Sequence, residues 1–149
     1  MKYWSGGIAS IILAGAGIVC APDAQASEPE LLAAVHASQI QVVRTLLAGG
    51  ADANQANAFG VTPLLQACRQ GDAEAVRLLL AAGADPDRRY VDGETVLMEA
   101  AASGSLPTVQ LLLARGVDVN AREQDQQQTA LMWAAAEGHA EVVRALLAA

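Results

Sequence analysis

The apolar residues after residue 27 follow the spacing of short amphipathic helices. Leucine pairs stand at positions 46–47, 79–80, 112–113 and 146–147. Val76 precedes one of these pairs by three and four residues, and Val109 precedes the next pair in the same way. Apolar residues at positions i, i+3 and i+4 share one face of a helix. The pattern therefore predicts a series of short helices, each with one buried face.

The same blocks recur at a nearly fixed interval. The segment Thr62-Pro63-Leu64-Leu65 returns as Thr95-Val96-Leu97-Met98 after 33 residues (95 − 62), and as Thr129-Ala130-Leu131-Met132 after a further 34 (129 − 95). Glycines at 71, 104 and 138 and Gly-x-Asp triplets at 50–52, 83–85 and 116–118 keep this register. Periods of about 20–50 residues are typical of repeat proteins. We predict one domain at 27–149, with units at about 28–60, 61–93, 94–127 and 128–149.

Each unit is predicted to hold two helices. Thr62, Thr95 and Thr129 suit N-caps, because a hydroxyl accepts a hydrogen bond from an N–H of the first turn. Gly71 and its equivalents end the first helix in a left-handed conformation, and the glycine of each Gly-x-Asp triplet ends the second. A lone helix pair cannot bury its apolar face, so stacked pairs share a core. The one extra residue falls between Asp118 and Thr129, where we predict a protruding loop.

These features resemble ankyrin repeats over residues 28–149. The resemblance is carried by Thr62-Pro63-Leu64, Gly71, Leu79-Leu80 and Gly83-Ala84-Asp85. It implies an all-α solenoid of four stacked helix-turn-helix units with hairpin-like loops, and a non-catalytic role in binding other proteins. Leu65, Met98 and Met132 occupy the position of the family's usual histidine. We therefore expect apolar packing to replace the hydrogen bonds of that histidine.

The resemblance also implies where a partner protein makes contact, namely at the loop tips and the inner side of each first helix. The loop-tip residues are Asn57, Phe59, Arg88, Arg89, Tyr90, Asp92, Glu94, Glu123 and Asp125, and the inner-helix residues are His36, Gln66, Arg69, Gln70, Glu99, Ser103, Trp133 and Glu137. From these we predict the following as partner-binding: Phe59, Gln66, Arg69, Arg88, Arg89, Tyr90, Asp92, Glu99, Trp133 and Glu137.

Aromatic residues and arginine concentrate binding energy in protein interfaces. Trp133 stands where the earlier units carry Gln66 and Glu99, so the core does not require an apolar group there. Trp133 is interpreted either as an anchor for a partner or as a ring packed over an alanine-rich helix. Arg88 and Arg89 are either contact residues or solvated turn residues.

The two end units depart from the repeated pattern. The first unit carries Pro29 at the cap position and Ser38 in place of the turn glycine. The sequence given ends at Ala149, directly after the last predicted helix. We expect the last unit to fray or to be covered by a partner.

Residues 1–26 have the layout of a secretory signal peptide. Lys2 gives a positive start, Ile8 to Cys20 carry no charge, and Ala24-Gln25-Ala26 places small residues where a signal peptidase cleaves. We predict cleavage after Ala26 and a periplasmic or secreted protein with no membrane contact thereafter. A retained membrane anchor is the alternative, although the run is shorter than the ~20 apolar residues a spanning helix needs. Val19 before Cys20 argues against a lipoprotein signal.

Composition narrows the possible partners. The chain has 149 residues, 53% hydrophobic, with nine basic residues against sixteen acidic ones and a net charge of −7. Removing residues 1–26 takes away Lys2 and Asp23 and leaves the charge unchanged. This balance disfavours nucleic-acid binding. It predicts a partner protein with a basic patch and a salt-sensitive association. After cleavage Cys68 is the single thiol, so no internal disulfide is expected.

Two further patterns suggest chemistry, and both have structural interpretations. Three pairs resemble calcium ligands, namely Asp52-x-Asn54, Asp85-x-Asp87 and Asp118-x-Asn120. They recur one unit apart, however, whereas calcium needs six to eight converging oxygens. We interpret them as turn residues that bond local N–H groups. His36, Cys68 and His139 fall in different units, and no nucleophile has a base partner at a recognisable spacing. No cofactor or metal is predicted.

The residues and the resemblance together favour a non-catalytic protein-binding module in the periplasm of a Gram-negative bacterium. Two alternatives stay open. One is an immunity-type or regulatory inhibitor of a secreted enzyme, and the other is a metal-dependent hydrolase.

Overall fold

The computed structural model describes residues 28–90 and 92–149, so the predicted export leader lies outside the described residues. Within these ranges eight α-helices follow one another in four pairs. The pairs are α1 (Glu30–His36) with α2 (Ile40–Ala48), α3 (Pro63–Gln70) with α4 (Ala73–Ala81), α5 (Val96–Ser103) with α6 (Leu106–Leu113), and α7 (Ala130–Ala136) with α8 (Ala140–Leu147). The all-α repeat predicted from the sequence is confirmed.

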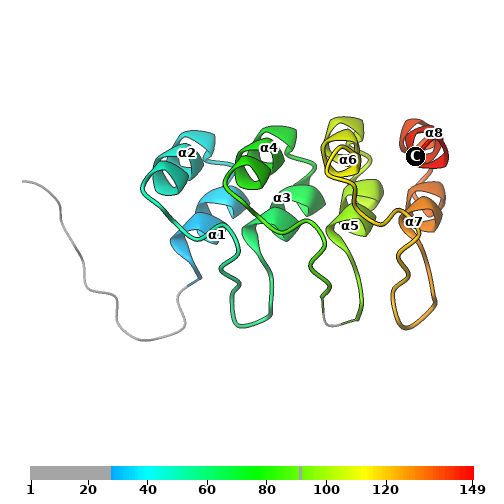
Figure 1. Cartoon of the computed structure of the whole chain (residues 1–149), viewed down its shortest axis with the longest axis horizontal. Helices are drawn as coiled ribbons and strands as arrows, with labels where there is room; N and C mark the ends of the chain where they lie inside the picture. The colour runs from blue at the N-terminus through cyan, green and yellow to red at the C-terminus, as the bar shows by residue number, and fades with distance from the viewer. Residues whose placement is uncertain (1–27, 91) are drawn as a thin grey trace, which may run out of the picture.

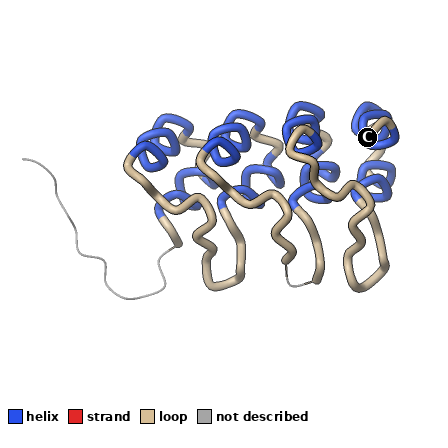
Figure 2. Tube along the Cα trace, in the orientation of Figure 1, coloured by secondary structure: helices blue, strands red, loops and turns tan. Residues whose placement is uncertain are grey.

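The helices form two layers (Figure 1). The helices α1, α3, α5 and α7 lie side by side in an inner layer, and α2, α4, α6 and α8 form an outer layer. Figure 2 shows that the loops joining one pair to the next project from the inner layer, away from the outer helices. In all three of them a hairpin-like bond from an N–H to a carbonyl closes the turn. The bonds run from Asn57 to Val61 (3.0 Å), from Tyr90 to Glu94 (3.1 Å) and from Glu123 to Gln128 (3.1 Å). The inner helices and the loops therefore share one side of the molecule.

Threonine hydroxyls begin three of the inner helices. Oγ1 of Thr62, Thr95 and Thr129 accepts a hydrogen bond from the N–H three residues on, at 3.2, 3.3 and 3.4 Å. The glycine after α3, Gly71, has a φ of 68°. Ser38 occupies the equivalent place after α1 with a φ of 54°. A left-handed conformation costs a residue with a side chain roughly 1–2 kcal/mol, so the first unit keeps the turn without its best-suited residue.

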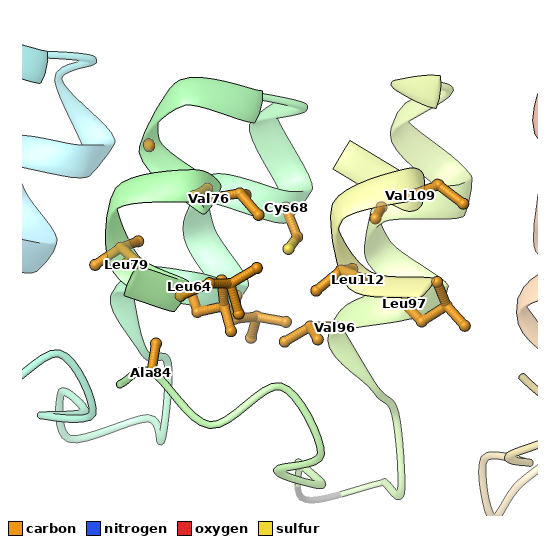
Figure 3. Close-up of a cluster of buried hydrophobic side chains, with 14 of the residues drawn as sticks. Leu64, Cys68, Val76, Leu79, Ala84, Val96, Leu97, Val109 and Leu112 are labelled. Carbon is orange, nitrogen blue, oxygen red and sulfur yellow. The ribbon is translucent and has the colours of Figure 1, made fainter. Parts of the chain in front are cut away.

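One cluster of buried apolar side chains extends from Leu31 in the first unit to Leu146 in the last. Figure 3 shows its centre, where Leu64 and Leu79 of the second unit lie in the same cluster as Leu112 of the third. Each of these three side chains is at most 1% exposed. The hydrophobic effect thus holds the units to one another as well as each helix to its partner.

The leucine and methionine at the family's histidine position do not all behave as predicted. Leu65 and Met98 are 3% and 0% exposed, so apolar packing does replace the histidine there. Met132 is 49% exposed, which corrects the prediction for the fourth unit. The reason is geometric: a neighbouring unit covers the equivalent side chain in α3 and α5, whereas α7, among the helices that the structure describes, has a neighbouring inner helix, α5, on one side only.

The described helices are all short. None of those within 28–90 and 92–149 combines the length and the hydropathy that spanning a bilayer requires.

The shared core makes a first prediction. Leu112→Ala removes a fully buried side chain between units and should lower the free energy of unfolding by about 2–5 kcal/mol. Leu147→Ala is the matched control, because Leu147 is 68% exposed and the change should stay within about 0.5 kcal/mol. Urea unfolding followed by circular dichroism measures both. Equal losses for the two variants would contradict the packing described.

Candidate functional site

The candidate site is the inner side of the stack together with the loops. Three inner helices present different side chains at one repeated position, namely Gln66 on α3, Glu99 on α5 and Trp133 on α7. The next residue along each helix, which is Ala67, Ala100 or Ala134, is fully buried. A constant buried residue thus fixes the helices while the neighbouring position varies. Such a position is free to serve recognition.

Arg69 and Glu99 meet across the inner face. Both Nε and Nη2 of Arg69 donate to Glu99 Oε1, with Nε at 3.2 Å. This bond raises the pKa of Arg69, since a carboxylate partner favours the charged guanidinium. The Glu99 side chain is 11% exposed, whereas that of Arg69 is 48% exposed. Of these two predicted contact residues, Arg69 therefore offers surface to a partner, and Glu99 mainly joins α5 to α3.

Trp133 lies beside a hollow of the inner face. The hollow has a volume of about 230 Å³ and is lined by Ala102, Gln128, Met132, Trp133, Ala136 and Glu137. Trp133 is partly buried and packs against the core. Glu137 follows it by one helical turn and is exposed. Trp133 packs against the core and also lines a surface hollow. Its role as an anchor for a partner stays a prediction.

Tyr90 is a structural strut, and its role as a contact residue stays a prediction. Its hydroxyl lies 2.8 Å from Thr62 Oγ1, the N-cap of α3, so the second loop is tied to the preceding inner helix. Burial raises the pKa of Tyr90 to about 12. Such a ring offers little of its surface to a partner.

The neighbouring arginines also make bonds within the stack. Arg88 Nη1 donates to the Asn54 carbonyl (3.3 Å). Arg89 Nη1 donates to the Arg122 carbonyl (3.5 Å), and its Nη2 lies 4.0 Å from Asp118 Oδ2. The Arg89 side chain remains 52% exposed, so it is the more accessible of the two.

Phe59 is the most exposed large apolar side chain among the described residues, at 84%. It stands at the tip of the first loop, where Asn57 Oδ1 accepts hydrogen bonds from the N–H groups of Phe59 (2.9 Å) and Val61 (3.0 Å). A fixed turn thus holds an aromatic ring in solvent. A ring in this position is suited to contact another protein.

Carboxylates gather near the tip of the second loop. Asp92 is exposed and Glu94 is half-buried. Burial raises the pKa of Glu94, and the negative charges of Glu99 and Asp92 raise it further. Like charges held together in this way favour a partner that brings positive charge.

Glu123 organises the third loop, which contains the extra residue. Its carboxylate accepts hydrogen bonds from the N–H groups of Asp125 (2.6 Å), Gln126 (2.9 Å) and Gln128 (2.7 Å). The donors lower the pKa of Glu123, because they stabilise the charged form. The side chain is 5% exposed. Glu123 therefore shapes the predicted protruding loop and is withdrawn from its surface.

The sequence analysis did not predict several hydrogen bonds between units. Asn54 binds the next unit twice, through its Nδ2 to the Gly83 carbonyl (3.0 Å) and from Asp85 N–H to its Oδ1 (2.8 Å). His139 Nε2 lies 3.0 Å from the Ala102 carbonyl. The side chain of Arg115 donates to the Leu80 carbonyl (3.0 Å). These bonds link neighbouring units in a chain that lacks the family's usual histidine.

The other candidate chemistry has structural explanations. The carboxylates of Asp52, Asp85 and Asp118 each accept from the N–H two residues on, at 2.9–3.0 Å, as a turn residue does. Cys68 is fully buried, and burial raises the pKa of its thiol, so it is an unreactive core residue. His36, Cys68 and His139 lie on different elements. Among the described residues no group of three or more His, Cys, Asp or Glu side chains could hold a metal.

Comparison with known proteins agrees with this architecture. A family model described as ankyrin repeats (3 copies) matches residues 31–123 and again residues 84–149. The chain belongs to the ankyrin-repeat family. A comparison with curated proteins returned no match. Ankyrin repeats generally mediate protein–protein interaction and are typically non-catalytic.

The strut formed by Tyr90 can be tested directly. Tyr90→Phe keeps the ring but removes the bond to Thr62, and it should lower the free energy of unfolding by about 1 kcal/mol. Phe59→Ala is the control, since an 84% exposed side chain should change stability by no more than about 0.5 kcal/mol. Thermal unfolding measures both variants. A neutral Tyr90→Phe would show that the bond does not stabilise the loop.

Glu123 should make the third loop sensitive to acid. A carboxylate whose pKa is lowered by folding stabilises the fold above its unfolded pKa, about 4.3, and that contribution disappears as pH falls through the lower folded value. The amide signals of Asp125, Gln126 and Gln128 should therefore shift together only below about pH 4. Glu123→Gln should shift them already at neutral pH. Nuclear magnetic resonance measures both, with the exposed Glu141→Gln on α8 as control. Unchanged amide signals in Glu123→Gln would contradict the assigned role.

Proposed function

We propose that this ankyrin-repeat protein is a non-catalytic module of the bacterial periplasm that binds a partner protein through its loop tips and inner face. One observation carries the proposal. The inner-face position that varies between units is occupied in the last unit by Trp133, a partly exposed aromatic ring beside a surface hollow. The shared core fixes α5 and α7, whose side chains line that hollow. A partner therefore meets a surface that is already formed.

Exposure to solvent reduces the set of predicted contact residues to a smaller group. Phe59 at the first loop tip, Arg69 and Glu137 on the inner side, and Arg89 beside the second loop reach solvent. Tyr90 and Glu99 support this surface from beneath through their bonds to Thr62 and Arg69. We expect the exposed residues to contact the partner directly. Tyr90 and Glu99 should affect binding by fixing the shape of the surface.

The sequence supports the proposed compartment and the proposed charge of the partner. The layout of residues 1–26 supports export and cleavage after Ala26. The net charge of −7 supports a partner with a basic patch, whose association weakens as salt screens the attraction. One candidate partner is a secreted enzyme, in which case this protein acts as its inhibitor.

Site-specific photocrosslinking in intact Gram-negative cells tests the proposal. A photoreactive amino acid at Gln66 on the inner side or at Phe59 on the first loop should capture the same protein. The same group at Gln41, an exposed residue of outer helix α2, should not capture it. Capture from the inner positions should fall as salt rises. Equal capture from Gln41, or none from both inner positions, would overturn the proposed surface.

A further inference from the structure

The inner face changes from polar to apolar at the hollow beside Trp133. One repeated position of the inner helices carries the exposed side chains of His36 on α1 and Arg69 on α3, but Ala102 on α5 and Ala136 on α7. Two methyl groups therefore line the hollow together with Trp133, at a position where the earlier units carry a large polar side chain. The two small residues open the hollow of about 230 Å³ in the inner surface.

The indole presents hydrocarbon to this hollow. Its one polar atom, Nε1, is buried and has no hydrogen-bond partner among the described residues. The exposed part of the ring is consequently carbon only. Met132, which is 49% exposed, adds its thioether chain to the same lining.

A carboxylate stands at the rim of the hollow. Glu137 follows Trp133 by four residues, and its N–H donates to the Trp133 carbonyl (3.1 Å), so the two side chains share one face of the helix. Glu137 is exposed and forms no ion pair within the described part of the chain. Arg69, a positive charge of the inner face, is already bound to Glu99.

We propose that this hollow binds a cationic side chain of the partner protein, an arginine above all. This inference rests on the proposed function and names the chemistry of its contact. The aliphatic stem lies over Met132 and the indole, as long basic side chains do on apolar surfaces. The guanidinium stacks on the tryptophan ring and reaches the Glu137 carboxylate.

Other occupants fit the hollow less well. An apolar side chain that filled it would take water away from the Glu137 carboxylate without supplying a hydrogen bond, and burying an unpaired charge is unfavourable. An acidic side chain would be repelled by the same carboxylate. Arginine is preferred to lysine because its planar group both stacks and forms two parallel bonds to a carboxylate.

Fluorescence titration of the full chain tests this proposal. The chain has two tryptophans, so Trp4→Phe leaves Trp133 as the single reporter. The probes are short acetylated peptides of glycine and serine with one central arginine, citrulline, leucine or glutamate. The arginine peptide should change the Trp133 emission in a saturable, salt-sensitive manner. Its affinity should be at least tenfold above that for the citrulline peptide, which has the same shape without the charge.

Three variants in this background locate the contact. Glu137→Gln removes the carboxylate and Ala102→Leu fills the hollow, and each should weaken binding of the arginine peptide fivefold or more. Glu141→Gln removes an exposed carboxylate of outer helix α8 and should leave binding unchanged. Circular dichroism shows whether each variant keeps its helices.

The possible results separate this inference from the proposed function. Equal binding of the leucine and arginine peptides, or no response to any peptide, would overturn the cationic site. Loss of binding in Glu141→Gln as great as in Glu137→Gln would also overturn it. If Gln66 crosslinking still captures a partner after Ala102→Leu, the inner face binds protein without this hollow. If crosslinking captures nothing from the inner side, the proposed function itself fails.

Discussion

Burial of each helix pair against its neighbours is the interaction on which the rest of the structure depends. The helices are seven to nine residues long, and helices this short are unstable alone in water. Their apolar faces reach the interior only because an adjacent unit covers them, as the contrast between Met98 at 0% and Met132 at 49% exposure shows. The continuous cluster from Leu31 to Leu146 therefore sets the spacing of the inner helices. That spacing in turn fixes where Gln66, Glu99 and Trp133 stand.

Hydrogen bonds and an ion pair between units add to the apolar contacts that hold the units together. With no histidine at the family's usual position, the links come from Asn54, Arg115 and His139, which bond to a neighbouring unit. They lie at the loops and turns, outside the core. An ion pair between Arg69 and Glu99 adds a link on the inner face itself. The binding surface is thus held in place by the core beneath it and by bonds at its edges. Few side chains or loops have to become ordered when a partner binds.

The repeat could be predicted because it is local and periodic. The 33-residue register, the caps at Thr62, Thr95 and Thr129, and the left-handed turn at Gly71 all follow from residues near one another in the sequence. The division of the site into exposed and supporting residues could not be predicted. Tyr90 and Glu99 bond to residues 28 and 30 positions away, and which side chain reaches across depends on the packing of adjacent units. Glu123 was assigned to a loop tip by position alone, and only its bonds to three N–H groups show that it faces inward.

Native-state hydrogen exchange of the full chain tests the dependence on neighbouring units most directly. In a stack held by nearest-neighbour packing, units covered on both sides open less often than units covered on one side. The amides of α3 and α5 should therefore exchange most slowly, and those of α1 and α8 should exchange faster. Equal protection in all four units, or the slowest exchange in α8, would contradict the account.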